Sequence, residues 1–331
     1  MAYFLKKIIA LFTGSPSENL PTSTETTANI KHKTDTIMSN EAKETTNLLP
    51  NISIFEYAEV SRDKGDEFSE DAHSIKSLDN QSYFISLCDG VTGGSLSRYA
   101  SRAVADIMTK YDIADVRDLT TYKDELQGLY SRSIANNPTI QKRLLDTQNP
   151  HTANLKQMIE TLPGATTLSS CHIQPSADGT HYNADVYIVG NGAFFVIRED
   201  GFETVMYSKE CLSGKYYSGV KVGINSFEIG SSKDYKGDFM EVKKSVKLYP
   251  GDVAYFMTDG LAAGVLDILE DTKKYSGILD PDCRDVHKFF KLMDHEKIEL
   301  MRTKLTKGHI IDDDDVTLIR LNIPESQTIA L

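Results

Sequence analysis

The sequence predicts an α+β fold in which a sandwich of antiparallel β-sheets is flanked by helices. Strand-like and helix-like segments come in blocks, which disfavours the strict alternation of a doubly wound parallel sheet. Hairpin-like turns containing Gly or Pro separate several of the strands. With 331 residues, of which 40% are hydrophobic, the chain is long enough to bury a sizeable core.

The N-terminal region differs in composition from the rest of the chain. Residues 1–12 are apolar, but they are too short to span a bilayer and carry Lys6 and Lys7 in their middle. No convincing cleavage site follows, so they make a poor secretory signal. Two alternatives stay open: peripheral membrane contact through an interfacial helix, and a terminus packed on its own domain. Residues 13–51 are rich in Ser, Thr, Asn, Glu and Lys and predict a disordered linker.

The compact domain is expected to span residues 52–323, followed by a short tail at 324–331. Period-two or continuous apolar patterns predict its strands, and apolar residues at helical spacing predict its helices. In its first half we expect strands at 52–60 and 83–88, a helix at 96–108, and two or three helices in 116–162 broken at Pro138 and Pro150.

The second half of the domain is richer in strands. A strand starts within 163–168, and 185–190 with 193–197 are predicted to form a β-hairpin around Gly190-Asn191-Gly192. Residues 206–238 lack a clear period and are interpreted as a mobile flap over a site. We then expect strands at 242–248 and 253–258, helices at 261–269 and 286–305, and a closing strand at 316–323.

Charge and cysteine content exclude two classes of function. The net charge of -12 and the absence of a long Lys/Arg block argue against nucleic-acid binding. The four cysteines show no zinc-binding spacing. Scattered cysteines without a signal peptide indicate reduced thiols, so we expect a cytoplasmic protein.

Acidic residues stand at the ends of several predicted strands. Asp89 and Asp259 each follow an apolar run and precede a glycine, Asp314 lies just before a strand, and Glu70-Asp71 forms a fourth acidic position. Carboxylates gathered in one place repel one another unless a cation neutralises them. A hard divalent cation bound by these oxygens is the natural solution.

Six short motifs in order resemble the metal-dependent type 2C (PPM) serine/threonine protein phosphatases. They are Ser69-Glu70-Asp71-Ala72-His73, Cys88-Asp89-Gly90, Gly164-Ala165-Thr166-Thr167, Gly190-Asn191-Gly192, Thr258-Asp259-Gly260-Leu261 and Asp314-Asp315-Val316-Thr317. Each motif is weak alone, but six in the family's order along 52–323 make the resemblance specific. It implies a central antiparallel β-sandwich with helices on both outer faces and a binuclear Mg²⁺/Mn²⁺ site at one end.

The resemblance also implies roles for individual residues. Asp89 resembles the carboxylate that bridges the two ions, and the Gly90 carbonyl and Glu70 resemble ligands of one of them. Asp259 and Asp314 resemble ligands of the other, and Asp71 resembles the acid that organises bound water. Two ions roughly 3.5 to 4 Å apart activate a bridging water for in-line attack on a phosphoryl group. The implied partner is a phosphorylated protein substrate.

Two departures from the family pattern concern a third, loosely held metal. Asn191 replaces an aspartate of the family, and Ala263 stands where many members have a further Asp. We therefore expect two ions, with the third site weakened.

Other departures concern catalysis itself. Val91 stands where some members have a His that protonates the leaving group, and Asp66 stands at the position of the phosphate-gripping Arg. Arg62 or Lys64 is then the candidate for gripping phosphate. An active phosphatase is the first hypothesis, and a catalytically weakened or binding-only member of the same fold is the alternative. A structural acidic protein is disfavoured, because solvated acids need not follow buried strands.

Overall fold

In the computed structural model, all described residues belong to one compact unit, Asn47–Leu331. They are 49–59, 69–78, 81–91, 96–146, 151–199, 201–205, 218–231, 241–270, 286–307 and 314–325. The apolar residues 1–12 and the candidate Arg62 lie outside these ranges, so their predicted roles stay predictions.

Two five-stranded antiparallel sheets and one three-stranded sheet form the framework, and each is named here by its central strand. The β12 sheet has the order β1 (Ser53–Glu59), β13 (Val316–Asn322), β12 (Val253–Met257), β7 (Ala193–Ile197) and β8 (Phe202–Val205). The β5 sheet has the order β11 (Glu241–Leu248), β6 (Tyr182–Val189), β5 (Leu168–Pro175), β3 (Ser82–Cys88) and β2 (Ala72–Leu78). The β9 sheet has the order β10 (Phe227–Ser231), β9 (Ser218–Val222) and β4 (Gly164–Thr166).

The β12 and β5 sheets pack face to face around a shared apolar core. Phe256 and Ile319 from one sheet meet Ile85, Leu87 and Ile173 from the other. Phe256 also packs edge-on against Phe194, with ring centroids 5.7 Å apart. This packing confirms the predicted antiparallel sandwich.

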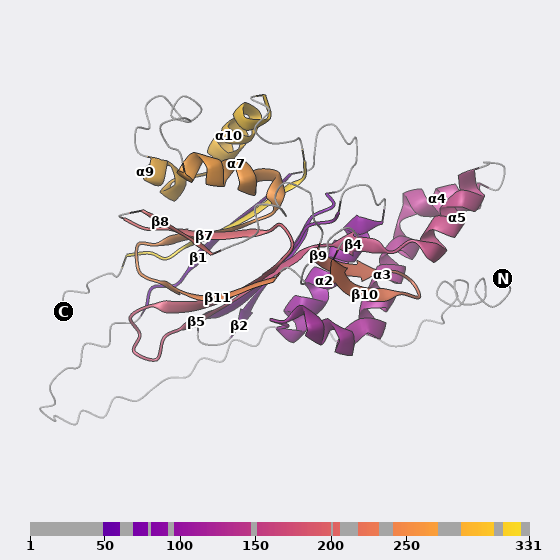
Figure 1. The fold of residues 1–331 in the computed structure, drawn as a ribbon, viewed down its shortest axis with the longest axis horizontal. Coiled ribbons are helices and arrows are strands. Elements are labelled where there is room, and N and C mark those ends of the chain that lie inside the picture. The colour runs from indigo at the N-terminus through magenta and orange to yellow at the C-terminus, as the bar shows by residue number, and fades with distance from the viewer. Residues whose placement is uncertain are drawn as a thin grey trace, which may run out of the picture. The chain divides into compact units, whose positions relative to one another are not determined.

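Helices cover the outer face of the β12 sheet. They are α7 (Asp259–Glu270), α9 (Val286–Lys291) and α10 (His295–Lys307), on the side away from the β5 sheet (Figure 1). Tyr255 and Met257 of β12 point into this helical layer, whereas Ala254 and Phe256 point into the sandwich core. Because both faces of β12 are buried, its sequence is a continuous apolar run.

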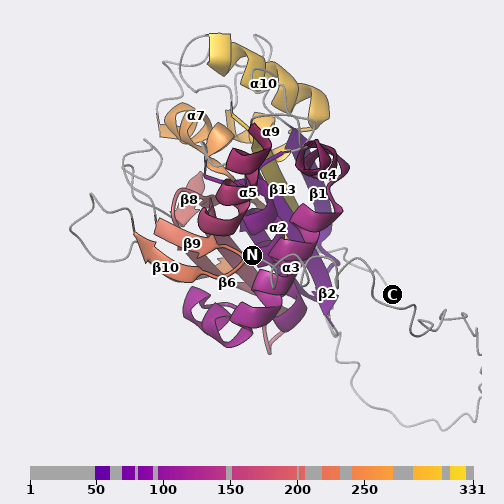
Figure 2. The ribbon, with the colours of Figure 1, turned by 90° about the vertical axis from the view of Figure 1, so that its right-hand side faces the viewer.

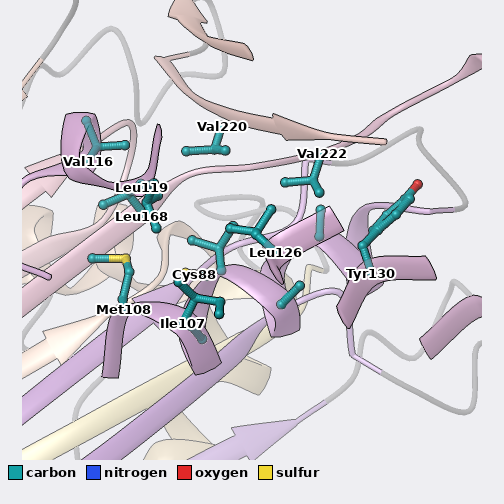
Figure 3. Packing of buried hydrophobic residues seen from close by; sticks show 14 of the residues in the cluster. Cys88, Ile107, Met108, Val116, Leu119, Leu126, Tyr130, Leu168, Val220 and Val222 are labelled. Carbon is teal, nitrogen blue, oxygen red and sulfur yellow. The ribbon is translucent and has the colours of Figure 1, made fainter. Parts of the chain in front are cut away.

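A second helical layer covers the outer face of the β5 sheet. Its α2 (Ser97–Tyr111) packs directly on β2 and β3, and the other helices pack beside α2 and one another: the 3₁₀ helix η1 (Val116–Tyr122), α3 (Lys123–Asn136), α4 (Pro138–Leu145) and α5 (His151–Thr161). The β9 sheet lies with these helices, toward the viewer in Figure 2. Figure 3 shows Ile107 and Met108 of α2, Leu126 of α3 and Val220 of β9 in the buried cluster that joins them. Helices therefore flank both faces of the sandwich, as predicted.

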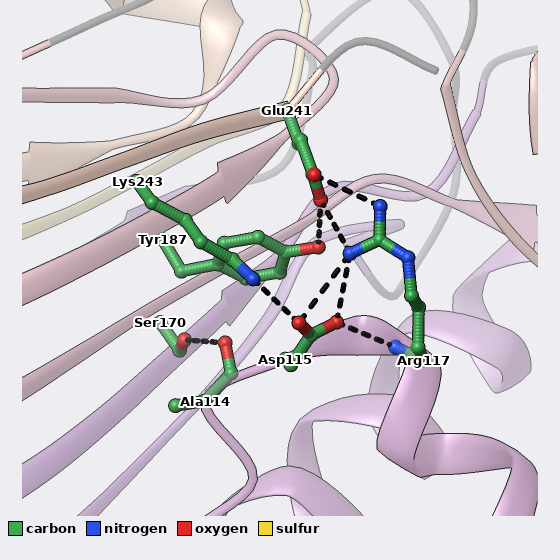
Figure 4. Close-up of polar contacts among 7 residues, drawn as sticks. All are labelled: Ala114, Asp115, Arg117, Ser170, Tyr187, Glu241 and Lys243. Carbon is green, nitrogen blue, oxygen red and sulfur yellow. Dashed lines mark hydrogen bonds and ion pairs between the residues drawn. The ribbon is translucent and has the colours of Figure 1, made fainter.

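The polar contacts in Figure 4 tie this second layer to the edge strand β11. The Arg117 guanidinium donates to both carboxylate oxygens of Glu241, at 2.8 and 2.9 Å. Lys243 contacts Asp115 at 2.5 Å, and the Tyr187 hydroxyl donates to Glu241 at 2.8 Å. Tyr187 is buried, but the four charged side chains are partly exposed, so their ion pairs orient η1 on the sheet more than they stabilise the fold.

The predicted hairpin of 185–190 with 193–197 is wrong. β6 pairs with β5 and β11, whereas β7 pairs with β12 and β8. Residues 190–192 carry the chain from one sheet to the other. Ile188 and Phe194 both enter the shared sandwich core, which the two strands reach from opposite sheets. A Gly-Asn-Gly turn suits a hairpin and a crossing equally well, so local sequence did not separate the two.

Two further predictions need correction. Within the predicted flap 206–238, residues 218–222 and 227–231 form the antiparallel pair β9–β10, and the rest lies outside the described residues. The single helical segment expected at 286–305 is two helices, α9 and α10, separated at 292–294. Within the described part of the chain, each helix is too short or too polar to cross a membrane.

Candidate functional site

Strand pairing brings the predicted acids to one end of the sandwich. In the β5 sheet Ala72 pairs with Cys88, so Asp71 before β2 lies beside Asp89 after β3. In the β12 sheet Met257 pairs with Leu318, so the end of β12 lies beside the start of β13. This second pairing brings Asp259 near Asp314.

Hydrogen bonds join the two pairs of acids across the two sheets. The Thr258 hydroxyl donates to Asp71 Oδ2 at 2.8 Å and accepts from the Thr317 amide at 3.0 Å. The Glu70 amide donates to Asp315 Oδ2 at 2.6 Å. The partners in these two contacts are 187 and 245 residues apart in the sequence, so the fold brings distant segments together here.

The backbone around Asp89 is held by the segment between β4 and β5. The Asp89 carbonyl accepts from the Thr167 amide and the Thr166 hydroxyl, each at 2.9 Å. Gly90 forms a bridge with Thr166, and a Cβ on Gly90 would lie 2.6 Å from the Glu70 carbonyl oxygen. Glycine is therefore required where the Asp89 loop passes the Glu70 backbone.

Burial and mutual repulsion change the proton affinity of the acids. Burial, followed by the charges of Asp315 and Asp259, raises the pKa of Asp71 to about 7, although the Thr258 hydrogen bond acts in the opposite direction. Burial, followed by the charges of Asp259, Asp71 and Asp314, raises the pKa of Asp89 well above its usual value. The charge of Asp259 acts on both Asp71 and Asp89, and that of Asp314 acts on Asp89, so these acids lie in one cluster.

Two buried oxygen atoms in this cluster have no hydrogen-bond partner among the described residues. They are Asp71 Oδ1 and Asn191 Oδ1. The other end of the Asn191 amide donates from Nδ2 to Asp259 Oδ2 at 2.5 Å. A buried acceptor without a donor is unfavourable, and a cation or a water molecule would satisfy it.

The cluster supplies the donor chemistry of a hard cation but not a closed ligand set. Its side-chain atoms are oxygens, which suit Mg²⁺ or Mn²⁺ better than zinc. In the described ranges, no three Asp, Glu, His or Cys side chains are arranged as ligands of one ion. Glu70 is buried, at 6% exposure, and its backbone amide and carbonyl lie within the cluster.

The structure brings the predicted acids together, but it does not test the roles predicted for them. Asp71, Asp89, Asp259 and Asp314 lie in one cluster. The roles assigned to these acids, and the ligand roles of Glu70 and Gly90, stay predictions. Arg62 lies outside the described residues.

Three contacts at this site were not predicted from sequence. They are the Thr258 bond to Asp71, the Asn191 bond to Asp259 and the Asp315 bond to the Glu70 amide. The threonine directly before Asp259-Gly260 was the one available signal, because a hydroxyl beside a site acid commonly orients it.

Comparisons with known proteins give a remote structural likeness. No protein-family model matches the chain, and no curated protein matches it. It is similar to a solved serine/threonine phosphatase of S. agalactiae, with 12% identity over 82% of this chain and 99% of that one and a TM-score of 0.42. It is similar to the Mycobacterium tuberculosis serine/threonine phosphatase PstP/Ppp, with 14% identity over 83% and 99% of the two chains and a TM-score of 0.41.

A third solved structure, RsbX in complex with magnesium, has 16% identity over 85% of this chain and 96% of that chain, with a TM-score of 0.41. Because these TM-scores lie below 0.5, no residue role is taken from these proteins. Proteins whose structures are described as serine/threonine phosphatases are among those that this chain is similar to.

Proposed function

We propose that this protein is a metal-dependent protein serine/threonine phosphatase that hydrolyses phosphomonoesters with a metal-activated water. The observation that carries the proposal is the cluster of Asp71, Asp89, Asp259 and Asp314, whose members come from four separate segments and repel one another. Such a cluster stores electrostatic repulsion that a divalent cation would relieve.

The proposed ligands are the side chains of Glu70, Asp89, Asp259 and Asp314 and the carbonyl of Gly90. Two Mg²⁺ or Mn²⁺ ions, when bound, would supply a water of lowered pKa and neutralise charge on a phosphoryl group. Because the described side chains do not form a closed ligand set, binding would require these carboxylates to reorient around the ions.

Asp71 is the candidate for handling a proton at this site. Its Oδ2 is fixed by Thr258 at 2.8 Å, whereas its buried Oδ1 has no hydrogen-bond partner among the described residues. Oδ1 is therefore placed to accept a hydrogen bond from a water molecule and to take up its proton. Phosphate binding is proposed for Arg62, as the resemblance suggests.

Hydrolysis of para-nitrophenyl phosphate and of a phosphoserine peptide, measured during Mn²⁺ and Mg²⁺ titrations, tests the proposal. We expect activity that requires the cation and is lost in Asp89→Asn. Asp185→Asn is the matched control, because Asp185 is an exposed acid on β6 of the same sheet and contacts Ser245. Absence of turnover at every cation concentration would contradict the phosphatase function.

A catalytically weakened, binding-only protein is the second candidate, and the replacement residues Asn191, Val91 and Asp66 favour it. Isothermal titration calorimetry separates the two functions. Tight Mn²⁺ binding without turnover would support the binding-only protein, whereas Mn²⁺ binding with turnover would support the phosphatase.

A further inference from the structure

The crossing segment Gly190–Gly192 connects the two sheets at the acid cluster. Gly190 has a φ of +99°, and a Cβ there would lie 2.6 Å from Thr167 Cγ2. A Cβ on Gly192 would clash with the Ser169 hydroxyl. Neither glycine can carry a side chain without displacing its neighbours, so Asn191 is held in a fixed position between them.

This segment touches both halves of the cluster. Thr167, against which Gly190 packs, donates its amide to the Asp89 carbonyl at 2.9 Å. The Asn191 amide donates to Asp259 Oδ2 at 2.5 Å. A short path of packed and hydrogen-bonded groups thus links the acid that follows β3 to the acid that follows β12.

The chemistry of this contact depends on the neutrality of Asn191. An amide N–H donates to a carboxylate without needing a shared proton or a cation. A second carboxylate at 2.5 Å in this partly buried place would repel Asp259 strongly. Asn191 Oδ1 belongs to the same amide group, so it adds a neutral, buried oxygen beside Asp259 rather than a further negative charge.

We infer that Asn191 is a positioning residue: a neutral tether that orients Asp259 and allows the acids to stay together when no cation is bound. The orientation of Asp259 toward a cation rests on the proposed function. The stabilisation of the cation-free protein does not, because it depends only on the contact between Asn191 and Asp259.

Two substitutions separate these roles. Asn191→Ala removes the tether, and Asn191→Asp keeps the size of the side chain but adds a charge. Asn183→Asp is the matched control, since Asn183 lies on β6, the strand that precedes the crossing segment, and pairs with Lys247 of β11. Far-ultraviolet circular dichroism establishes that each variant is folded.

Calorimetric titration with Mn²⁺ tests the orienting role on the full chain. We expect Asn191→Ala to bind Mn²⁺ about 10- to 100-fold more weakly, as loss of a group that orients a metal ligand typically does. Activity of Asn191→Ala should recover at high Mn²⁺, whereas a general folding defect would not be rescued in this way. Unchanged Mn²⁺ affinity in Asn191→Ala would overturn the orienting role.

Thermal melting in EDTA tests the tether without any cation. We expect Asn191→Asp to melt several degrees below Asn191→Ala and to show the larger rise in melting temperature when Mn²⁺ is added. Equal melting temperatures for Asn191→Asp and Asn183→Asp in EDTA would overturn the tether. If the unsubstituted protein binds no Mn²⁺, the proposed function and the orienting role fail together, while the comparison in EDTA still decides the tether.

The folding of Asn191→Asp gives two further outcomes. If this variant folds only with Mn²⁺, the tether is supported. If it does not fold at all, the test passes to Asn191→Ala: a melting temperature of Asn191→Ala in EDTA equal to that of the unsubstituted protein overturns the tether.

Discussion

Substitution of Asp71 by Asn should remove the contribution of Asp71 to the pH dependence of stability between pH 4 and pH 7 in the cation-free protein. Asp71 is 6% exposed, and its pKa is raised from 3.8 to about 7 by burial, followed by the charges of Asp315 and Asp259. Asparagine is neutral at every pH in this range and keeps an oxygen that accepts from Thr258. The variant therefore changes the charge while it preserves the hydrogen bond.

The sign and size of the effect follow from proton linkage. Between pH 3.8 and about 7 the folded protein holds a proton on Asp71 that the unfolded chain has released. Stability is therefore highest at low pH for this group and falls as the pH rises to about 7, where the loss is complete. A shift of about three pKa units at 1.36 kcal/mol each gives an upper limit of about 4 kcal/mol. At roughly 2 to 4 °C per kcal/mol, this limit is about 10 °C in melting temperature.

Urea denaturation of both proteins in EDTA at several pH values measures the effect. The informative quantity is the difference in unfolding free energy between Asp71→Asn and the unsubstituted protein, because contributions from distant carboxyl groups cancel in it. This difference should move in favour of the variant as the pH rises from 4 to 7. A difference that does not change with pH would refute the assignment of a raised pKa to Asp71.

Two further substitutions test the framework around the site. A Cβ on Gly260 would overlap the Asp315 backbone carbonyl. Gly260→Ala should therefore destabilise the protein by about 1–3 kcal/mol or more, measured by urea denaturation, and weaken Mn²⁺ binding, measured by calorimetry. Wild-type Mn²⁺ affinity in that variant would argue against a site at this end of the sandwich. Phe256 is fully buried between the sheets, so Phe256→Ala should cost about 3–5 kcal/mol by urea denaturation, and a cost below about 1 kcal/mol would contradict the shared core.

Sequence patterns located individual strands well where an apolar run ended in a clear break. Tyr83 to Cys88 and Val253 to Thr258 are such runs, and β3 and β12 lie there. Their apolar residues serve two cores, one on each face, which is why the runs are continuous. The partner of each strand was harder to predict, as the crossing at Gly190–Gly192 shows. Strand partners are chosen by packing among all strands, and no local pattern encodes that choice.

The acids of the site were predictable for a different reason. Asp89 and Asp259 interrupt buried apolar segments, so their positions are conspicuous in the sequence. The groups that hold the acids in place were less visible. Thr258 reaches Asp71 across a separation of 187 residues, and Asn191 reaches Asp259 across 68, so both contacts exist only in the folded chain.

The neutral hydrogen-bond donors around the cluster reduce the free-energy cost of burying its carboxylates without removing their charge. Thr258, Asn191 and the Glu70 amide each donate one hydrogen bond to a carboxylate. These bonds orient the acids, yet burial and repulsion still keep the pKa of Asp71 near 7. A cluster with a purely structural role would be more stable if one acid were replaced by a neutral residue, since buried like charges oppose folding. A positive charge at the cluster would relieve this repulsion, and the divalent cation of the proposed function would supply one.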